Sequence, residues 1–421
     1  MPTVPQFMRS LACLALLLTP VLSACSATDT EPPPIAPFDS LHVTLSATLA
    51  VGRTVRPTLT IFRDNVAEPS SVDSLELQAQ TRLESSNPHI VSVVDGSFRA
   101  NAVGRAIVSA QVAGKRSDML VDVVAGYPVT FIEGTDGALV SGMNDSGDVI
   151  GSFADKTHFL VQHGQLRDIG ACTPRDINNA GQVACVVVDT GSYTYGHAAL
   201  LSDGTLTMLF GDELGAATGI TESGAVFGQI TSNASDSTLQ IGAFIWNAGK
   251  VTHPYLYLLG ETYDVNSSLH GVVVSYYNMY PLSFLVVDSM SHMLLQPNGR
   301  WSQGRAVNDA DDVVGQNECM YCDGSTPTIW RAANHWSPER TGARARTAVG
   351  ISEDGHVVGT GRDGGYTWQD GRYTILGDAI ADSGWRITGG AAISRGGLIA
   401  AVGEHQSGKR GVVLIDLRSV H

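Results

Sequence analysis

The side chains best suited to chemistry in this chain are two carboxylates, Asp176 and Asp264. Each stands two residues before a copy of a short phrase that recurs along the C-terminal part of the chain. Five of the seven equivalent positions hold Gly or Ala, so the two carboxylates interrupt a column of small residues. Two carboxylates can act as acid and base on a glycan, or can hold a cation. The alternative, which we favour, is that each caps a turn or accepts backbone N–H bonds near the axis of the fold.

Aromatic residues in predicted loops form a second group of ligand-binding candidates. They lie outside the positions that repeat along the chain, and they are Tyr276, Tyr277, Tyr280, Trp301, Tyr321 and Trp336. Such side chains can form a platform for a sugar or a peptide, or they can cover the surfaces of sheets. Trp246, Trp330 and Trp368 recur in register, and we expect them in the core.

Other catalytic and metal-binding motifs do not occur in the sequence. The acidic run at 308–312 lacks the ligand spacing and the distant Glu of a calcium loop, and it is expected to be a turn. The sequence contains no His-Glu-x-x-His, no Gly-x-Ser-x-Gly and no phosphate-binding Gly-rich loop. We therefore predict no cofactor and no metal.

The recurring phrase, hereafter the turn phrase, predicts the fold. Its first residues follow one another at steps of 34 to 45 residues, and they are Asn144, Asn178, Thr221, Asn266, Asn308, Ser352 and Ser394. Most copies carry a polar tetrapeptide that ends in Gly and is followed by apolar residues, which is typical of a β-hairpin tip. Further apolar segments in each unit give four strands, the content of one β-propeller blade.

The best copies, at 143–151, 307–315 and 351–359, resemble the HAF-type extracellular repeats, which carry a phrase like Ile-Asn-Asp-x-Gly-x-Val-Val-Gly. The resemblance covers residues 128 to 421, although the Asp-Leu-Gly-Thr-Leu-Gly-Gly segment of that family is absent. It implies an exported propeller and brings no catalytic residue. A spare strand at 129–132 can pair with the last strand, at 412–415, and so close a ring of seven blades.

The segment before the repeats alternates polar and apolar residues with a period of two, as half-buried antiparallel strands do. It resembles the bacterial immunoglobulin-like family, group two, although Leu83 stands where that family often has Trp. The matching residues are Val51-Gly-Arg-Thr54, Ser85-Ser-Asn-Pro88, Ile90-Val-Ser-Val93, Ala102-Val-Gly-Arg-Ala106 and Val121-Asp-Val123. The resemblance implies a β-sandwich over residues 38–125 that serves as a spacer or an adhesive module, of which we favour the spacer.

The N-terminus has the features of a targeting segment. Residues 1–24 contain an apolar run of signal-peptide length and lead into Leu22-Ser-Ala-Cys25, which resembles the lipobox of bacterial lipoproteins. The resemblance implies that Cys25 carries the lipid anchor, and that residues 25–37 form a Pro-rich tether. We expect an extracytoplasmic protein attached to the cell membrane or the outer membrane.

Charge and cysteine content narrow the function further. A net charge of -15 argues against binding nucleic acid, which requires clustered Lys and Arg. Four cysteines remain beyond the leader and Cys25, and an even number in an exported chain favours disulfides. Cys172 and Cys185 flank the second turn phrase, where a hairpin brings them close, and Cys319 and Cys322 form a predicted loop staple.

The sequence therefore predicts an all-β chain with a small immunoglobulin-like β-sandwich followed by a seven-bladed β-propeller at 126–421. We predict a non-enzymatic, lipid-anchored surface protein whose propeller binds a glycan, a peptide or an envelope protein. The remaining candidates are a polysaccharide hydrolase or lyase that uses Asp176 and Asp264, and a structural envelope component. The oligomeric state and the ligand stay open.

Overall fold

A computed structural model describes residues 35–64, 66–67, 77, 79–188, 196–211, 213–232, 240–277, 280–287, 290–294, 301–317, 326–342 and 344–419. Strands dominate these ranges, and the helical segments with assigned bounds are η2 (Ala332–Asn334), α2 (Leu376–Ala379) and η3 (Leu417–Ser419). The all-β prediction is confirmed. No helix in the described part of the chain is both long and apolar enough to cross a bilayer. The leader, Cys25, Cys319, Tyr321 and Cys322 lie outside the described residues.

The N-terminal strands form three small sheets. The first contains β1 (Ser40–Thr44), β4 (Thr58–Arg63) and β5 (Val66–Ala67). The second contains β2 (Thr48–Ala50), β10 (Lys115–Val124), β9 (Gly104–Val112) and β6 (Arg82–Ser85). The third contains β3 (Thr54–Val55), β8 (Ser97–Ala100) and β7 (Val91–Val94). Alternate apolar residues of these strands enclose one core, in which Leu49, Phe98 and Val108 are fully buried.

Seven four-stranded antiparallel sheets follow in the described residues, and we number them 1 to 7 along the chain. Sheet 1 contains β12 (Leu139–Met143), β13 (Val149–Ser152), β14 (His158–Gln162) and β15 (Gln165–Asp168). Sheet 2 contains β16 (Cys172–Ile177), β17 (Val183–Val187), β18 (His197–Ser202) and β19 (Thr205–Met208). Sheet 3 contains β20 (Leu214–Ile220), β21 (Val226–Ser232), β22 (Gln240–Asn247) and β23 (Lys250–Leu259). Sheet 4 contains β24 (Glu261–Val265), β25 (Gly271–Tyr277), β26 (Tyr280–Val287) and β27 (Met290–Met293).

The last three sheets complete this series. Sheet 5 contains β28 (Ser302–Val307), β29 (Val313–Asn317), β30 (Thr326–Arg331) and β31 (Ser337–Arg340). Sheet 6 contains β32 (Gly350–Ile351), β33 (Val357–Gly361), β34 (Gly364–Gln369) and β35 (Arg372–Ile375). Sheet 7 contains β36 (Trp385–Ile393), β37 (Leu398–His405), β38 (Arg410–Asp416) and, from the front of the region, β11 (Val129–Phe131).

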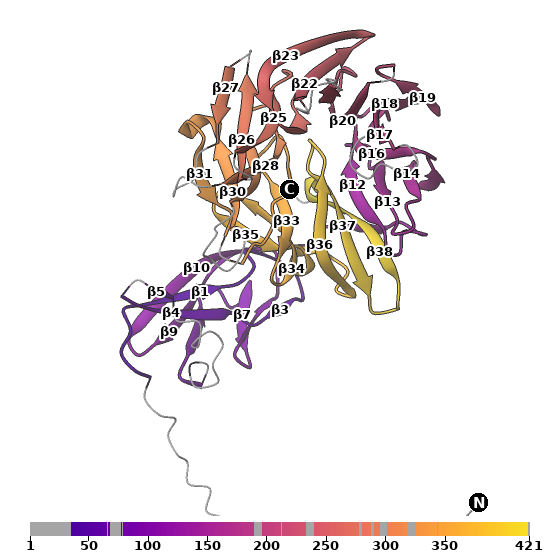
Figure 1. The fold of residues 1–421 in the computed structure, drawn as a ribbon. Helices are drawn as coiled ribbons and strands as arrows, with labels where there is room; N and C mark the ends of the chain where they lie inside the picture. Colours follow the sequence, from indigo (N-terminus) through magenta and orange to yellow (C-terminus); the bar gives the residue numbers. More distant parts are fainter. Residues whose placement is uncertain are drawn as a thin grey trace, which may run out of the picture.

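The sheets are arranged in a circle (Figure 1). The first strand of each sheet contacts the first strand of the next, and β36 of sheet 7 contacts β12 of sheet 1. The pairing of β11 with β38, in which Thr130 faces Leu414, joins the two ends of the region as the sequence predicts. Apolar residues between neighbouring sheets form the core, and Trp330 and Trp368 are buried there.

The turn phrase forms the connection between the first two strands of every sheet. The fourth position of the phrase has a positive φ in all seven copies. Gly fills that position in five copies, as at Gly147 (φ 84°), whereas Leu269 (φ 66°) and Asp311 (φ 61°) fill it in sheets 4 and 5. Glycine adopts this conformation without steric cost, which explains its recurrence. The copy at 266–272 that looks degraded in sequence therefore keeps the backbone geometry of the others.

The N-terminal sheets dock on sheet 6 (Figure 1). The N–H of Ala47 donates to the carbonyl of Tyr373 at 2.8 Å, and the N–H of Ile375 donates to Oγ of Ser46 at 2.9 Å. The guanidinium of Arg372 forms an ion pair with Asp122 at 2.7 Å. Backbone and charged contacts together fix the orientation of these sheets relative to the circle.

Candidate functional site

The turn phrases meet at one end of the circle and link each sheet to the next. Nδ2 of Asn144 donates to the carbonyl of Asn178 at 3.0 Å, and Nδ2 of Asn178 donates to the carbonyl of Thr221 at 3.1 Å. The same bond runs from Asn266 to Asn308 and from Asn308 to Ser352. These first residues are buried, so their repetition reflects a structural role at the end of the axis.

The second residues of the phrases form an outer layer of hydrogen bonds. The N–H of Asp145 donates to Asn179, the N–H of Asn179 to Glu222, and the N–H of Asp309 to Glu353, each to a side-chain oxygen at 2.8 to 2.9 Å. The N–H of Gly396 donates to Oδ1 of Asp145, which closes the layer between sheets 7 and 1. Most of the acceptors are carboxylates, so this end of the axis is acidic.

Arg395, at the second position of the last phrase, crosses this acidic layer. Its Nη1 lies 2.9 Å from Oδ1 of Asp309 and 3.0 Å from Oε1 of Glu353. Its Nη2 donates at 3.3 Å to the carbonyl of Val265, which belongs to sheet 4, across the circle from sheet 7. Burial opposes the charge of Arg395, but the surrounding carboxylates outweigh it and hold the pKa of Arg395 above its ordinary value. Arg395 therefore spans this end and neutralises part of its charge.

The axis of the circle contains a cavity of about 730 Å³. We call the end at the turn phrases the phrase end, and the end where the first strands of the sheets begin the mouth. Asp176 and Asp264 both line the cavity close to the phrase end. The structure thus brings the two candidate carboxylates to one cavity, from sheets 2 and 4.

Each of these carboxylates accepts two backbone N–H bonds. Asp176 accepts from Ile177 and from Ile220 of sheet 3, both at 2.8 Å. Asp264 accepts from Val265 at 2.8 Å and from Val307 of sheet 5 at 2.9 Å. Both oxygens of each group accept backbone N–H bonds, which is the structural alternative given above to a catalytic role. Each aspartate thereby joins its own sheet to the next.

The surroundings of the two carboxylates disfavour their charged forms. Burial, and then the charge of Asp264, raises the pKa of Asp176 to about 7. Burial also raises the pKa of Asp264, while the N–H of Val307 and the charge of Arg395 act against that rise. A carboxyl group that titrates near neutral pH has the property of a general acid. Each oxygen of Asp176 accepts one backbone N–H and retains a second lone pair, so Asp176 has a structural role and also lines the cavity.

Bulges in the first strands place further side chains in the cavity. The strand register shifts three residues before the turn phrase in six of the seven sheets, for example between Pro174 and Asp176 and between Gly304 and Ala306. A bulge leaves a residue unpaired and changes the direction of its side chain. The residues at this position all line the cavity, and they are Ser141, Arg175, Thr218, Tyr263, Arg305, Val349 and Ala391.

Two arginines, a tyrosine and a glutamate gather toward the mouth. The guanidinium of Arg305 lies 5.5 Å from the ring centre of Tyr263, and the hydroxyl of Tyr263 donates to Glu261 at 3.1 Å. Arg175 forms no hydrogen bond or ion pair with any residue that the structure describes. Burial lowers the pKa of Arg175, while the nearby Tyr263 and Glu261 act in the opposite direction. The mouth thus contains a cationic side chain with unused donors.

The predicted aromatic platform lies on sheets 4 and 5, outside the cavity lining. The hydroxyl of Tyr276 donates to Glu261 at 3.3 Å, which places Tyr276 beside the mouth with half of its surface exposed. Trp301 stacks on Tyr280 at 4.3 Å, and Nε1 of Trp336 donates to the carbonyl of Asp311 at 3.0 Å. Tyr277 belongs to β25, and its side chain lies outside the described set. Tyr276 thus shares the acceptor Glu261 with Tyr263, whereas Trp301 and Trp336 make their contacts elsewhere on sheets 4 and 5.

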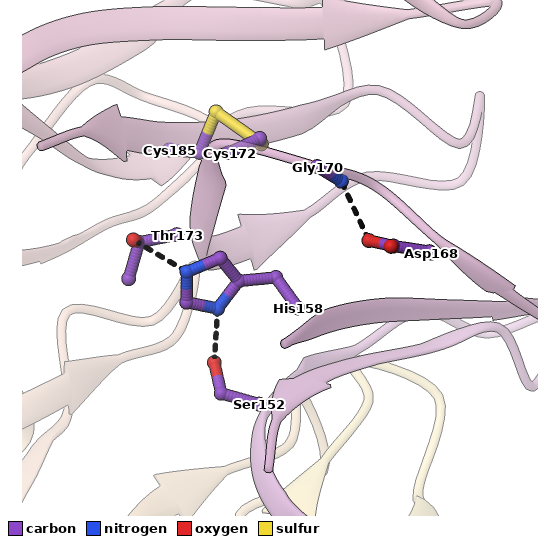
Figure 2. The surroundings of a disulfide bond; sticks show 7 residues. All are labelled: Ser152, His158, Asp168, Gly170, Cys172, Thr173 and Cys185. Carbon is purple, nitrogen blue, oxygen red and sulfur yellow. Dashed lines mark hydrogen bonds between the residues drawn. A yellow bond between two sulfur atoms is a disulfide. The ribbon is translucent and has the colours of Figure 1, made fainter. Parts of the chain in front are cut away.

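The disulfide between Cys172 and Cys185 is confirmed, with 5.4 Å between the Cα atoms. Figure 2 shows it beside His158, whose ring bonds Oγ of Ser152 at 2.8 Å and Oγ1 of Thr173 at 3.0 Å. Burial lowers the pKa of His158, which favours its neutral form. The disulfide links β16 to β17 within sheet 2, and His158 joins sheet 1 to sheet 2 through Thr173; none of these residues is part of the cavity lining.

Comparisons with known proteins give structural similarity only. No protein-family model matches the chain, and no curated protein matches its sequence. The β-propeller domain of the Trilobed protease from Pyrococcus furiosus is similar with a TM-score of 0.42 and 9% identity, over 82% of this chain and 98% of the other. TolB from Acinetobacter baumannii has a TM-score of 0.39 and 9% identity, over 91% of this chain and 97% of TolB. Virginiamycin B lyase from Staphylococcus aureus has a TM-score of 0.42 and 12% identity, over 69% of this chain and 99% of the lyase.

Proposed function

We propose that the chain is a non-enzymatic binding protein that takes its ligand in the axial cavity through the mouth. The observation that carries this proposal is the set of side chains three residues before each turn phrase, because all seven of them line the same cavity. A cavity of about 730 Å³ falls within the range of roughly 300 to 1,000 Å³ that is usual for small-ligand sites. A glycan, or one end of a peptide, is the size of ligand that fits.

The remaining architecture is consistent with a protein displayed at a surface. We interpret the seven sheets as a seven-bladed β-propeller at 126–421 and the N-terminal sheets as an immunoglobulin-like sandwich at 38–125. In this proposal Cys25 carries the lipid, residues 25–37 form the tether, and the sandwich is a spacer. Its contacts with sheet 6, such as the ion pair between Arg372 and Asp122, support a spacer that holds the mouth in a fixed orientation.

The hydrogen bonds of Asp176 and Asp264 favour binding over catalysis. All four oxygens accept a backbone N–H, and the bonds from Ile220 and Val307 join neighbouring sheets, so both carboxylates already have a structural role. Arg395 crosses the phrase end and pairs there with Asp309 and Glu353, so we place the ligand entrance at the mouth.

A combined screen tests the proposal. The purified full chain is applied to glycan and peptide arrays, and each ligand that binds is then incubated with the protein and analysed for cleavage. We expect saturable binding without turnover. Turnover that is lost in Asp176→Asn and Asp264→Asn would identify an enzyme, and the absence of any binding or turnover would identify a structural component.

A further inference from the structure

Five side chains gather at the mouth, and we call them the mouth cluster: Glu261, Tyr263, Gln303 and Arg305, which form a hydrogen-bonded network, and Arg175 beside them. Nη2 of Arg305 donates to Oε1 of Gln303 at 3.2 Å, and Nε2 of Gln303 donates to the hydroxyl of Tyr263 at 3.2 Å. The hydroxyl of Tyr263 in turn donates to Glu261. The network holds the Tyr263 ring and the Arg305 guanidinium in place before any ligand arrives.

Arg175 is the member of the cluster that lacks a partner among the described residues. The bulge between Pro174 and Asp176 directs it into the cavity, apart from the paired part of β16. Arg175 is exposed, so its unused donors are accessible to a ligand that enters the cavity. The planar, five-donor geometry of arginine suits a carboxylate, which it binds through two parallel hydrogen bonds.

The cavity also contains carboxylates, and their positions decide where an anion can bind. Asp176 and Asp264 accept backbone N–H bonds, while Glu353 pairs with Arg395. Most carboxylates of the cavity thus lie at the phrase end, whereas Glu261 lies at the mouth and accepts from the hydroxyls of Tyr263 and Tyr276. Arg175 and Arg305 outnumber this single carboxylate, so the described side chains of the mouth cluster carry a net positive charge.

The remaining members of the cluster suit a hydroxyl-rich ligand. Glu261 offers acceptors, the second amide hydrogen of Gln303 offers a donor, and the Tyr263 ring offers an apolar surface. Alternating donors and acceptors beside an aromatic ring match the hydroxyl groups and C–H faces of a sugar better than they match an apolar peptide side chain.

We propose that the mouth cluster binds an acidic saccharide, whose carboxylate is held by Arg175 and whose ring lies against Tyr263 and Arg305. This inference rests on the proposed binding function of the cavity and specifies its ligand class. The sugar acid enters with its carboxylate toward Arg175, and the acidic phrase end limits how deep the negative charge can go. A neutral saccharide of the same size lacks the group that compensates Arg175.

Calorimetric titration of the full chain tests this inference. The probes are trigalacturonate and 3′-sialyllactose, each beside its methyl ester, which keeps the sugar and removes the charge. We expect the acids to bind about tenfold or more tightly than the esters, and Arg175→Met to remove that difference. The control is Arg340→Met, since Arg340 is exposed on the outer strand β31, and this variant is expected to bind like the wild type.

The outcomes separate this inference from the proposed function. Equal affinity of acids and esters, or preference for peptides on the arrays, leaves the cavity as a binding site and overturns the acidic saccharide. Failure of both acids to bind overturns the inference as well, and an array without any ligand removes the proposed function too. Because acid and ester are compared on the wild-type chain, the result stands even where Arg175→Met fails to fold.

Discussion

Asp176 connects two sheets while its surroundings disfavour its charge. Its carboxylate accepts from Ile177 and Ile220, yet burial and the neighbouring Asp264 raise its pKa to about 7. A buried carboxyl group of this kind makes stability depend on pH, because the unfolded chain releases its proton at a much lower pH than the folded protein does.

The sign of this sensitivity can be predicted. The pKa of Asp176 is raised in the folded state from 3.8 to about 7, so its contribution to stability is fully present below about 3.8 and is lost as the pH rises through about 7. Asp176→Asn cannot ionise. The unfolding free energy of the wild type minus that of the variant is therefore expected to fall as the pH rises from 4 to 8. Urea denaturation across that range measures it, and a constant difference would contradict the assignment.

The two candidate aspartates were predictable at the residue scale, and the two arginines were not. Asp176 and Asp264 stand out because they replace Gly or Ala at a repeated position. Arg175 and Arg305 each stand one residue before that position. The regular alternation of side chains along a β-strand would direct them away from the axis. Only the bulge turns them inward, and nothing in the local sequence specifies it. The seven copies of the bulge position hold six different residue types, so its functional role leaves no repeated signal.

The turn phrase is the element that organises the molecule. Its first residue both shapes its own turn and bonds the next sheet. Oδ1 of Asn144 accepts from the N–H groups of Ser146 and Asp148, while its Nδ2 donates to the carbonyl of Asn178. In two other copies the first residue is Thr221 or Ser352, and its hydroxyl oxygen accepts the N–H of the residue four positions later in the turn.

Removal of one such side chain should therefore have a large effect. Asn144→Ala leaves two turn N–H groups and the buried carbonyl of Asn178 without this partner, and we expect a loss of about 2–3 kcal/mol of unfolding free energy. The neighbouring Asn179 is exposed, so Asn179→Ala is expected to lose less than about 1 kcal/mol. Chemical denaturation of the two variants gives the comparison. Equal losses of unfolding free energy would show that the buried first residues of the turn phrases stabilise the fold no more than the exposed second residues do.

Turn chemistry explains why the elements could be predicted well. Asn or Ser at the start and Gly at the fourth position appear in most copies, and the structure forms a hairpin at each one. Leu269 and Asp311 adopt the same positive φ, although their residue types do not predict it. The tertiary contacts of neighbouring phrases impose the conformation there. The disulfide was predictable for the same reason, since Cys172 and Cys185 flank one of these hairpins.

The whole circle depends on the pairing of β11 with β38. This contact brings together segments from opposite ends of the region, and it covers the edge that β38 would otherwise expose. Because Ile132 donates to the carbonyl of Val412, the alternation of an antiparallel ladder makes Thr130 the preceding hydrogen-bonded position.

Proline at position 130 tests this closure. Thr130→Pro removes the ladder N–H and is expected to cost about 1–3 kcal/mol, whereas Thr130→Ala keeps the N–H and is expected to cost less than about 1 kcal/mol. Denaturant titration measures both. If the proline variant proves as stable as the alanine variant, the pairing of the two ends does not contribute to stability.

The order of the sheets was predictable at this scale, but the docking of the N-terminal sheets was not. Repetition along the chain reveals the units and the spare strand at 129–132. The contacts of Ala47, Ser46 and Asp122 with sheet 6 involve backbone groups and single side chains without a sequence pattern. Such contacts follow from surface shape, which composition and periodicity do not encode.

The central claim is that a ligand binds inside the axial cavity, and filling the cavity tests it most directly. Ala391 lines the cavity at a bulge, so Ala391→Trp places an indole in the space that the ligand needs. Ala333, in η2 on the outside of sheet 5, is exposed and provides the matched control Ala333→Trp. Titration with the ligand that binds best to the wild type should show affinity lost in Ala391→Trp and kept in Ala333→Trp. Unchanged affinity in a folded Ala391→Trp variant would place the ligand elsewhere and contradict the account.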